Sequence, residues 1–152
     1  MINLGIIGLG LIGGSMAIDL RRKGFAQTLV GVDADPVNAA AAEKIGLVDR
    51  VVTLDECVDQ SDVIILAVPV DAALKLLPTI LDRFEQTGAE GKLVMDVCST
   101  KEQLSRSVKY HAKRKMYVAS HPMSASICSA GSSVWAMRKE PLERFSTPRN
   151  PS

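Results

Sequence analysis

The stretch Ile2-Asn3-Leu4-Gly5-Ile6-Ile7-Gly8-Leu9-Gly10-Leu11-Ile12-Gly13 decides the fold of this chain. A short apolar run, typical of a strand buried on both faces, leads directly into the glycine pattern GxGxxG. Apolar residues then recur at helical spacing from Leu11 to Lys23, and Gly24 is a typical helix stop. The sequence therefore predicts a strand, a tight glycine corner and a helix.

Each glycine of this corner has a physical reason to be there. Gly8 permits the tight turn, Gly10 lets a diphosphate approach the backbone, and Gly13 lets the helix pack closely on the strand. The helix begins at Leu11 and Ile12, where free N–H groups and the positive end of the helix dipole favour phosphate. The pattern predicts dinucleotide binding, with glycines that merely pack a helix on a sheet as the alternative.

A carboxylate at the end of the next strand sharpens this prediction. Asp33 lies 20 residues beyond Gly13, where it can accept hydrogen bonds from the adenosine ribose. It would repel a 2′-phosphate, and the following residue is Ala34 rather than arginine, so we expect NAD rather than NADP. Asp35 is the competing carboxylate, but helix capping before Pro36 explains it better.

Strand and helix patterns alternate up to about residue 120. We expect strands at residues 2–7, 28–33, 51–52, 62–68, 92–96 and 116–119. Between them we expect helices at 11–23 and 36–45, a short capped helix from Thr53, a helix capped by Asp71 and broken at Pro78, and a helix at 100–112. This alternation predicts an α/β fold with a doubly wound, mostly parallel sheet of the Rossmann type.

Other strand ends carry candidate site residues, because ligands of open α/β sheets bind beyond the carboxyl ends of the strands. Val68 and Pro69 can line the nicotinamide side of the coenzyme, or Pro69 simply terminates a strand. Ser99 is either a site residue or, like Thr100, a helix cap, and Lys101 can be a solvated helix-start lysine. His121 follows the last strand as either a base for a substrate hydroxyl or a structural histidine.

Composition narrows the classes of function. The 152 residues suffice for one domain, with 47% hydrophobic and 23% charged residues. A net charge of +1 argues against nucleic acid and anionic membranes as partners. Without an apolar run of membrane-spanning length or a signal peptide, we expect a cytoplasmic protein. Cys57, Cys98 and Cys128 are widely spaced, which predicts reduced thiols and no metal site.

Five motifs in order resemble the prephenate dehydrogenase family over residues 1 to about 123. They are Gly5–Ser15, Gly31-Val32-Asp33, Val63–Val70, Asp96–Lys101 and His121-Pro122-Met123. The resemblance implies an NAD-dependent oxidative decarboxylation of prephenate to 4-hydroxyphenylpyruvate, in tyrosine biosynthesis. It implies that His121 accepts the proton of the 4-hydroxyl, that Ser99 contacts the hydroxyl and that histidine, and that the full-length enzyme is a homodimer.

The sequence after Met123 departs from the family pattern. A serine- and proline-rich segment without apolar periodicity replaces the expected Ala-Gly and helical domain. We therefore expect residues 1–123 to form the NAD-binding domain and 124–152 an irregular tail from a shifted reading frame or truncated gene. Such a chain would be weakly active or inactive. The alternatives are an arogenate or 3-hydroxyacid-type dehydrogenase domain and a non-catalytic dinucleotide-binding module.

Overall fold

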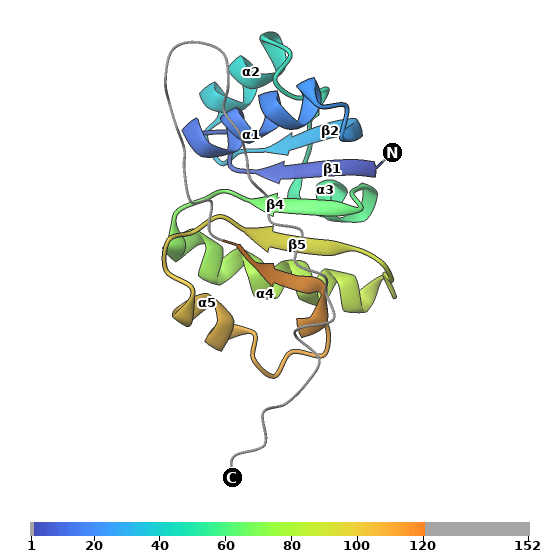
Figure 1. Cartoon of the computed structure of the whole chain (residues 1–152), viewed down its shortest axis with the longest axis vertical. Helices are drawn as coiled ribbons and strands as arrows, with labels where there is room; N and C mark the ends of the chain where they lie inside the picture. The colour runs from blue at the N-terminus through green and yellow to red at the C-terminus, as the bar shows by residue number, and fades with distance from the viewer. Residues whose placement is uncertain (1, 121–152) are drawn as a thin grey trace.

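Six parallel strands form one sheet in the order β3-β2-β1-β4-β5-β6 (Figure 1). The computed structural model describes residues 2–120. The strands are β1 (Ile2–Ile7), β2 (Ala26–Val32), β3 (Arg50–Val51), β4 (Val63–Leu66), β5 (Leu93–Asp96) and β6 (Tyr117–Ala119). The strand order reverses between β1 and β4, so the predicted doubly wound sheet is confirmed.

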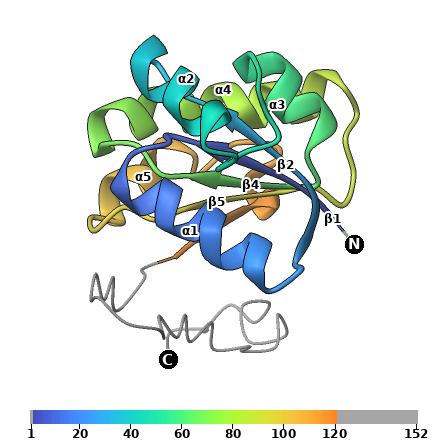
Figure 2. The same ribbon diagram turned by 90° about the horizontal axis from the view of Figure 1, so that it is seen from above.

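Helices cover the sheet on both sides and enclose two separate cores. They are α1 (Leu11–Arg22), α2 (Pro36–Lys44), α3 (Leu54–Gln60), α4 (Val70–Gln86), α5 (Glu102–Ser107) and the short 3-10 helix η1 (Arg114–Met116). Figure 2 shows α1 and α4 on opposite sides of the sheet. One core joins side chains of α1 and α2 to the sheet, and the other joins α3, α4 and α5 to it.

The register of the sheet places the ends of five strands at one level. Ile7 pairs with Val32 of β2 and with Leu66 of β4. Leu66 pairs in turn with Asp96, and Asp96 with Ala119. The segments that follow these strands therefore begin side by side along the carboxyl edge of the sheet, where the arrowheads in Figure 1 point.

Local signals set most of the helix ends. Gly24 adopts φ +62°, and the N–H of Phe25 donates to the carbonyl of Leu20, so the predicted glycine stop closes α1. The Asp35 carboxylate caps α2 by accepting from the N–H of Val37 at 2.8 Å. Thr53 begins α3 in a capping box. These three predictions are confirmed.

The predicted break at Pro78 is wrong, as is the predicted Asp71 cap. Helix α4 runs unbroken through Pro78 and begins one residue before Asp71, with Pro69 as its N-cap residue. Its buried stripe recurs at helical spacing on both sides of the proline: Ala73, Leu77, Ile80, Leu81 and Phe84. Packing of this stripe outweighs the local cost of the proline.

Pro78→Ala is therefore expected to stabilise the protein. Alanine restores the N–H that the helix interior lacks, although the more flexible unfolded chain offsets part of the gain. We expect the free energy of unfolding to rise by about 1–2 kcal/mol. Urea denaturation followed by circular dichroism measures this, and an unchanged or lower midpoint would show that α4 is already adapted to the proline.

The helix expected at 100–112 is much shorter, because tertiary contacts end it. Helix α5 stops at Ser107, and the next side chain, Val108, is buried in the core. His111 then contacts Asp82 of α4, with 2.9 Å between Nε2 and Oδ1. The guanidinium of Arg114 lies 4.9 Å from the ring centre of Tyr117. These contacts accompany turns at residues 108–113 and the 3-10 helix η1 in place of a continued α-helix.

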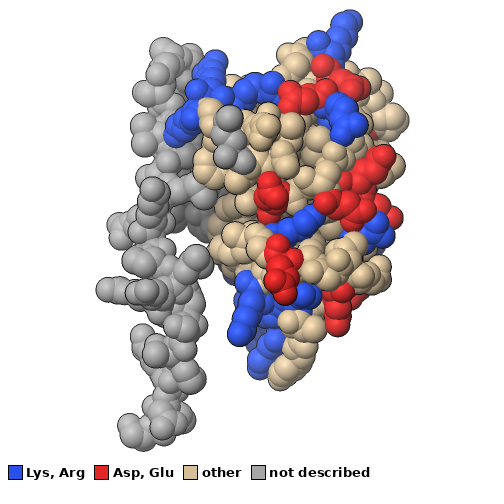
Figure 3. Space-filling view, turned by 90° about the vertical axis from the view of Figure 1, so that its right-hand side faces the viewer, with Lys and Arg blue, Asp and Glu red and all other residues tan. Residues whose placement is uncertain are grey.

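The tail expected at 124–152, the boundary at 123 and His121 all lie outside the described residues. Within residues 2–120, no helix is both long and apolar enough to cross a membrane. Figure 3 views the molecule from the side where the strands begin, and acidic and basic side chains alternate there without one sign prevailing.

Candidate functional site

The corner between β1 and α1 is wedged between the ends of β2 and β4. Gly8 adopts φ +95°, a conformation that L side chains rarely take, and its N–H donates to the carbonyl of Val32 at 2.8 Å. A Cβ at Gly8 would lie 2.3 Å from the backbone oxygen of Ala67. The turn therefore has room for glycine alone, as the motif predicts.

The other two glycines of the motif differ in what surrounds them. A Cβ at Gly13 would lie 1.9 Å from the backbone oxygen of Gly8, so this position holds α1 tightly against the turn. A Cβ at Gly10 would meet no atom of the described residues within 4 Å. Gly10 is thus not required for packing, and the open space beside it is what a close-approaching ligand needs.

The first turn of α1 offers unpaired backbone donors at this open space. The first helical hydrogen bond runs from the N–H of Gly14 to the carbonyl of Gly10, so the N–H groups of residues 11–13 precede the helical ladder. Gly10 provides no side-chain cap, and the first turn contains no acidic residue. Leu11 and Ile12 are 67% and 42% exposed. This arrangement suits an anion such as a diphosphate.

Asp33 directly follows β2 and is fixed by two backbone hydrogen bonds. Its Oδ2 accepts from the N–H of Leu9 and its Oδ1 from the N–H of Asp35, each at 2.8 Å. The carboxylate therefore braces the glycine corner itself. An ionised carboxylate has about four acceptor positions, so two remain for ligand hydroxyls.

The segment after β4 lies against the same corner. β4 ends at Leu66, two residues earlier than predicted, and Pro69 is the N-cap residue of α4 rather than the end of the strand. A Cβ at Gly8 would also lie 2.9 Å from Cγ1 of Val68. Val68 and Pro69 both follow the carboxyl end of β4, which is level with those of β1 and β2, and Val68 is half-buried and Pro69 exposed.

The end of β5 contains interactions that the sequence prediction missed. Asp96 is completely buried and accepts hydrogen bonds from Tyr117 and from the backbone of Cys98. Lys101, for which a solvated position was one interpretation, forms an ion pair with it. The only signal of this ion pair in the sequence is that Asp96 ends a predicted strand five residues before Lys101.

Neither Ser99 nor Thr100 caps α5, because its N-cap residue is Lys101 and no side chain there bonds to the helix. Ser99 is exposed in the turn after β5, at the same edge of the sheet as the glycine corner. His121 follows Ser120, the last described residue. The structure thus brings together the candidate residues that follow β1, β2, β4 and β5.

Cys57 and Cys98, the cysteines in the described part of the chain, are free thiols, and both are buried. Burial raises the pKa of Cys57 to about 11. Burial, reinforced by the charge of Asp96, also raises the pKa of Cys98. Both therefore remain protonated and weakly reactive at neutral pH.

One surface group within the described part of the chain combines possible metal ligands: Asp82, Glu85 and His111. His111 Nδ1 accepts a hydrogen bond from the N–H of Lys113 at 3.0 Å. In the neutral ring this places the proton on Nε2, which then donates to Asp82. The nitrogen that faces the carboxylates is therefore a donor and not a free ligand.

Comparisons with known proteins agree on one family. A sequence profile described as "Prephenate dehydrogenase, nucleotide-binding domain" matches residues 16–134. The prephenate dehydrogenase of Lactococcus lactis subsp. cremoris is 33% identical over 123 residues, covering 80% of this chain and 34% of the relative. That of Bacillus subtilis is 32% identical over 124 residues, covering 80% and 32%. The chain spans about a third of the length of these relatives.

Solved structures show the same similarity. Prephenate dehydrogenase from A. aeolicus, in complex with hydroxyphenyl propionate and NAD+, superposes with a TM-score of 0.63 at 27% identity, covering 81% of this chain and 42% of the other. Synechocystis arogenate dehydrogenase gives a TM-score of 0.64 at 27% identity, covering 83% and 42%. The resemblance inferred from the motifs is confirmed. The chain belongs to the prephenate dehydrogenase family of oxidoreductases and contains its nucleotide-binding domain.

Proposed function

We propose that this domain binds NAD at the corner between β1 and α1. The open space at Gly10 carries the proposal, because the N–H groups of residues 11–13 follow it directly and no side chain of residues 2–120 accepts a hydrogen bond from them. The diphosphate binds there through hydrogen bonds and the helix dipole. The NAD+ complex of the A. aeolicus relative, which has the same fold, supports this choice of ligand.

Asp33 selects NAD over NADP in this proposal. Its two remaining acceptor positions bind the ribose hydroxyls, whereas a 2′-phosphate would meet a fixed negative charge. Ala34 offers no cation to compensate that repulsion. Val68 and Pro69 line the part of the edge that leads from the glycine corner towards β5 and the nicotinamide.

For the whole protein we propose the oxidative decarboxylation of prephenate. When bound, NAD supplies the hydride acceptor. Ser99 contacts the 4-hydroxyl of the substrate, and His121 accepts the proton of that hydroxyl. Both follow strands whose carboxyl ends lie level with the glycine corner, at Asp96 and Ala119. A base in position beside a bound coenzyme is what a reaction driven by aromatisation needs.

Isothermal titration calorimetry tests the proposal on the 152-residue chain. We expect saturable NAD binding and NADP binding weaker by about tenfold or more, because a charged hydrogen bond is exchanged for repulsion. Prephenate and arogenate are then titrated into the NAD-loaded protein. A heat of binding with prephenate supports the substrate assignment. A heat of binding with arogenate but not with prephenate contradicts it and favours the arogenate reaction. Coenzyme binding with both substrates silent favours a non-catalytic module, and equal affinity for NADP contradicts the role of Asp33.

A further inference from the structure

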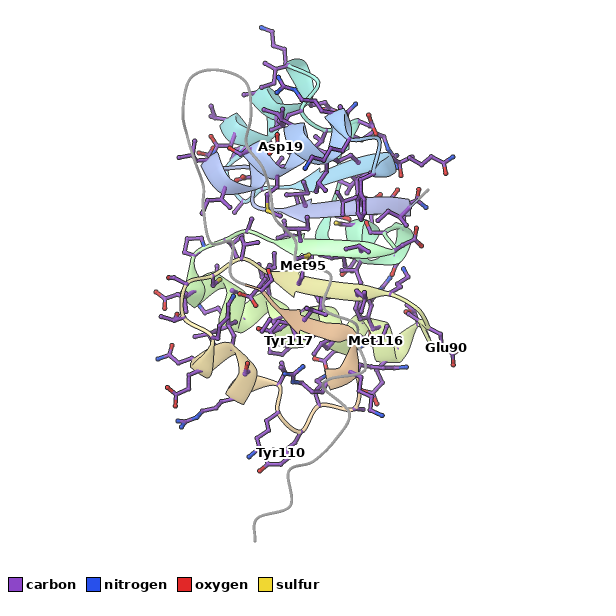
Figure 4. All side chains as sticks on the ribbon, in the orientation of Figure 1. Asp19, Glu90, Met95, Tyr110, Met116 and Tyr117 are labelled. Atoms are coloured by element: carbon purple, nitrogen blue, oxygen red, sulfur yellow. The ribbon has the colours of Figure 1, made fainter. Side chains whose placement is uncertain are left out.

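Asp96 is a buried charge at the carboxyl end of β5. Its side chain is 0% exposed, and Tyr117 donates to its Oδ2 at 2.7 Å. Its Oδ1 accepts from the N–H of Cys98 at 2.9 Å and from the ammonium of Lys101. Figure 4 shows Tyr117, which reaches Asp96 from β6 on the side of the sheet that α4 and α5 cover.

The energetics make Lys101 the essential partner. A carboxylate taken out of water is costly unless an opposite charge and hydrogen bonds compensate it. Burial, together with Asp96, raises the pKa of Tyr117, so this hydroxyl stays protonated and acts as a neutral donor. Lys101 is 27% exposed and is the only cation in the described chain paired with Asp96.

These contacts surround the turn that carries Ser99. Cys98, whose N–H donates to Asp96, lies one residue before Ser99. Lys101, whose ammonium donates to the same carboxylate, lies two residues after Ser99. The Cys98 thiol also donates to the carbonyl of Val68 at 3.5 Å, which joins the turn to the end of β4. The backbone oxygen of Asp96 accepts from Ser120 at 2.6 Å, one residue before His121.

We propose that Asp96 is a positioning residue whose charge, compensated by Lys101, holds the turn of residues 97–100 so that Ser99 faces the coenzyme edge. The hydrogen bond from the Ser120 hydroxyl to the backbone oxygen of Asp96 connects the end of β5 to the residue before His121. The functional meaning of this clamp rests on the proposed roles of Ser99 and His121. The clamp itself is a property of described residues and is testable without turnover.

Peptide-resolved alkylation of cysteines with iodoacetamide tests the clamp in the whole chain. Cys98 reports on the turn, and the fully buried Cys57 in α3 reports on global unfolding. Lys101→Met leaves Asp96 buried without a counter-ion, so we expect Cys98 to react about tenfold faster or more. Cys57 is expected to change less than about twofold, because the rest of the fold stays closed.

Three variants separate a charge clamp from general loosening. Lys101→Arg keeps the charge and is expected to restore a Cys98 rate within about threefold of the wild type. Adding Asp96→Asn to Lys101→Met removes the unpaired charge and is expected to slow the Cys98 thiolate again relative to Lys101→Met alone. Rates of all variants are compared as the limiting rate of the thiolate, taken from the pH dependence of alkylation, because the charges of Asp96 and Lys101 also shift the pKa of Cys98. Arg106→Met is the matched control, because it removes an exposed i,i+4 pair with Glu102 in the same helix and leaves both cysteine rates unchanged.

Equal acceleration of Cys57 and Cys98 in Lys101→Met would overturn the clamp, as would a Cys98 rate equal to that of the wild type. No slowing in the double variant would show that charge compensation is not its basis. Calorimetry of NAD binding to Lys101→Met is expected to give a Kd within about threefold of the wild type, because the glycine corner is built on β1 and β2. Failure of the wild type to bind NAD would contradict the proposed function and leave the alkylation result standing.

Discussion

Gly10→Ala is expected to abolish tight coenzyme binding without affecting the fold. Its φ of −70° and ψ of −160° suit alanine, and within residues 2–120 the new Cβ meets no atom closer than 4 Å. The free energy of unfolding is therefore expected to stay within about 0.5 kcal/mol of the wild type. In the proposed complex the methyl group takes the space of the diphosphate, so we expect NAD affinity to fall by about 100-fold or more.

Two neighbouring glycines complete this experiment. At Gly14 a Cβ would lie 3.4 Å from a side-chain carbon of Leu47, an ordinary contact, so Gly14→Ala is the matched control that keeps both stability and affinity. Gly13→Ala drives a Cβ into the backbone of Gly8 and is expected to cost about 3 kcal/mol of stability. Calorimetry and urea denaturation of all three variants check the pattern. Unchanged NAD affinity in Gly10→Ala would place the diphosphate elsewhere.

Asp33→Asn is expected to weaken NAD binding and the glycine corner together. Both carboxylate oxygens accept backbone N–H groups, so the amide nitrogen of asparagine must face one of two donors, at Leu9 or Asp35. One hydrogen bond is lost, and we expect a cost of about 1–3 kcal/mol in stability. The charged hydrogen bond to the ribose is lost as well, which lowers NAD affinity by about tenfold or more.

In Asp33→Asn, the affinity for NADP is not expected to rise by the factor by which the affinity for NAD falls. Removing the charge of Asp33 relieves the repulsion, but no cation replaces it and the corner loses its brace. Asp35→Asn is the matched control, because asparagine also caps helices well, the Asp35 side chain accepts from Val37 in the first turn of α2, and the substitution keeps the backbone N–H that donates to Asp33. Calorimetry with both coenzymes decides this. Full NAD affinity in Asp33→Asn would show that the carboxylate contacts no ligand.

The sequence predicted those parts of the molecule that local chemistry determines. Gly8 and Gly13 are predictable because a Cβ at either position would clash with the backbone of a β–α corner of this kind. The Thr53 capping box is predictable because it needs only residues at the start of its own helix. The position of Asp33 at the end of β2 was predictable because its spacing from the motif follows from the length of one helix and one strand. The parallel sheet follows from alternation alone.

Tertiary contacts determined the parts that the sequence did not predict. Pro78 breaks an isolated helix, but a buried stripe on both sides of it holds α4 together. The ion pair of Lys101 with Asp96 depends on Tyr117, which arrives from a strand 21 residues away and completes the burial of the carboxylate. Residues 108–116 have the composition of a basic helix, yet His111 and Arg114 have partners that only the folded chain supplies.

Titration of the 15N-labelled chain with NAD, followed residue by residue by NMR, tests the central claim most directly. We predict that the backbone amide resonances of Leu11, Ile12 and Gly13 move most, because the diphosphate becomes their hydrogen-bond partner. Those of Leu9 and Asp35 are expected to move with them, because both amides bind Asp33. Saturating NAD that leaves these five resonances in place, or that moves only resonances remote from the β1–α1 corner, would contradict the account.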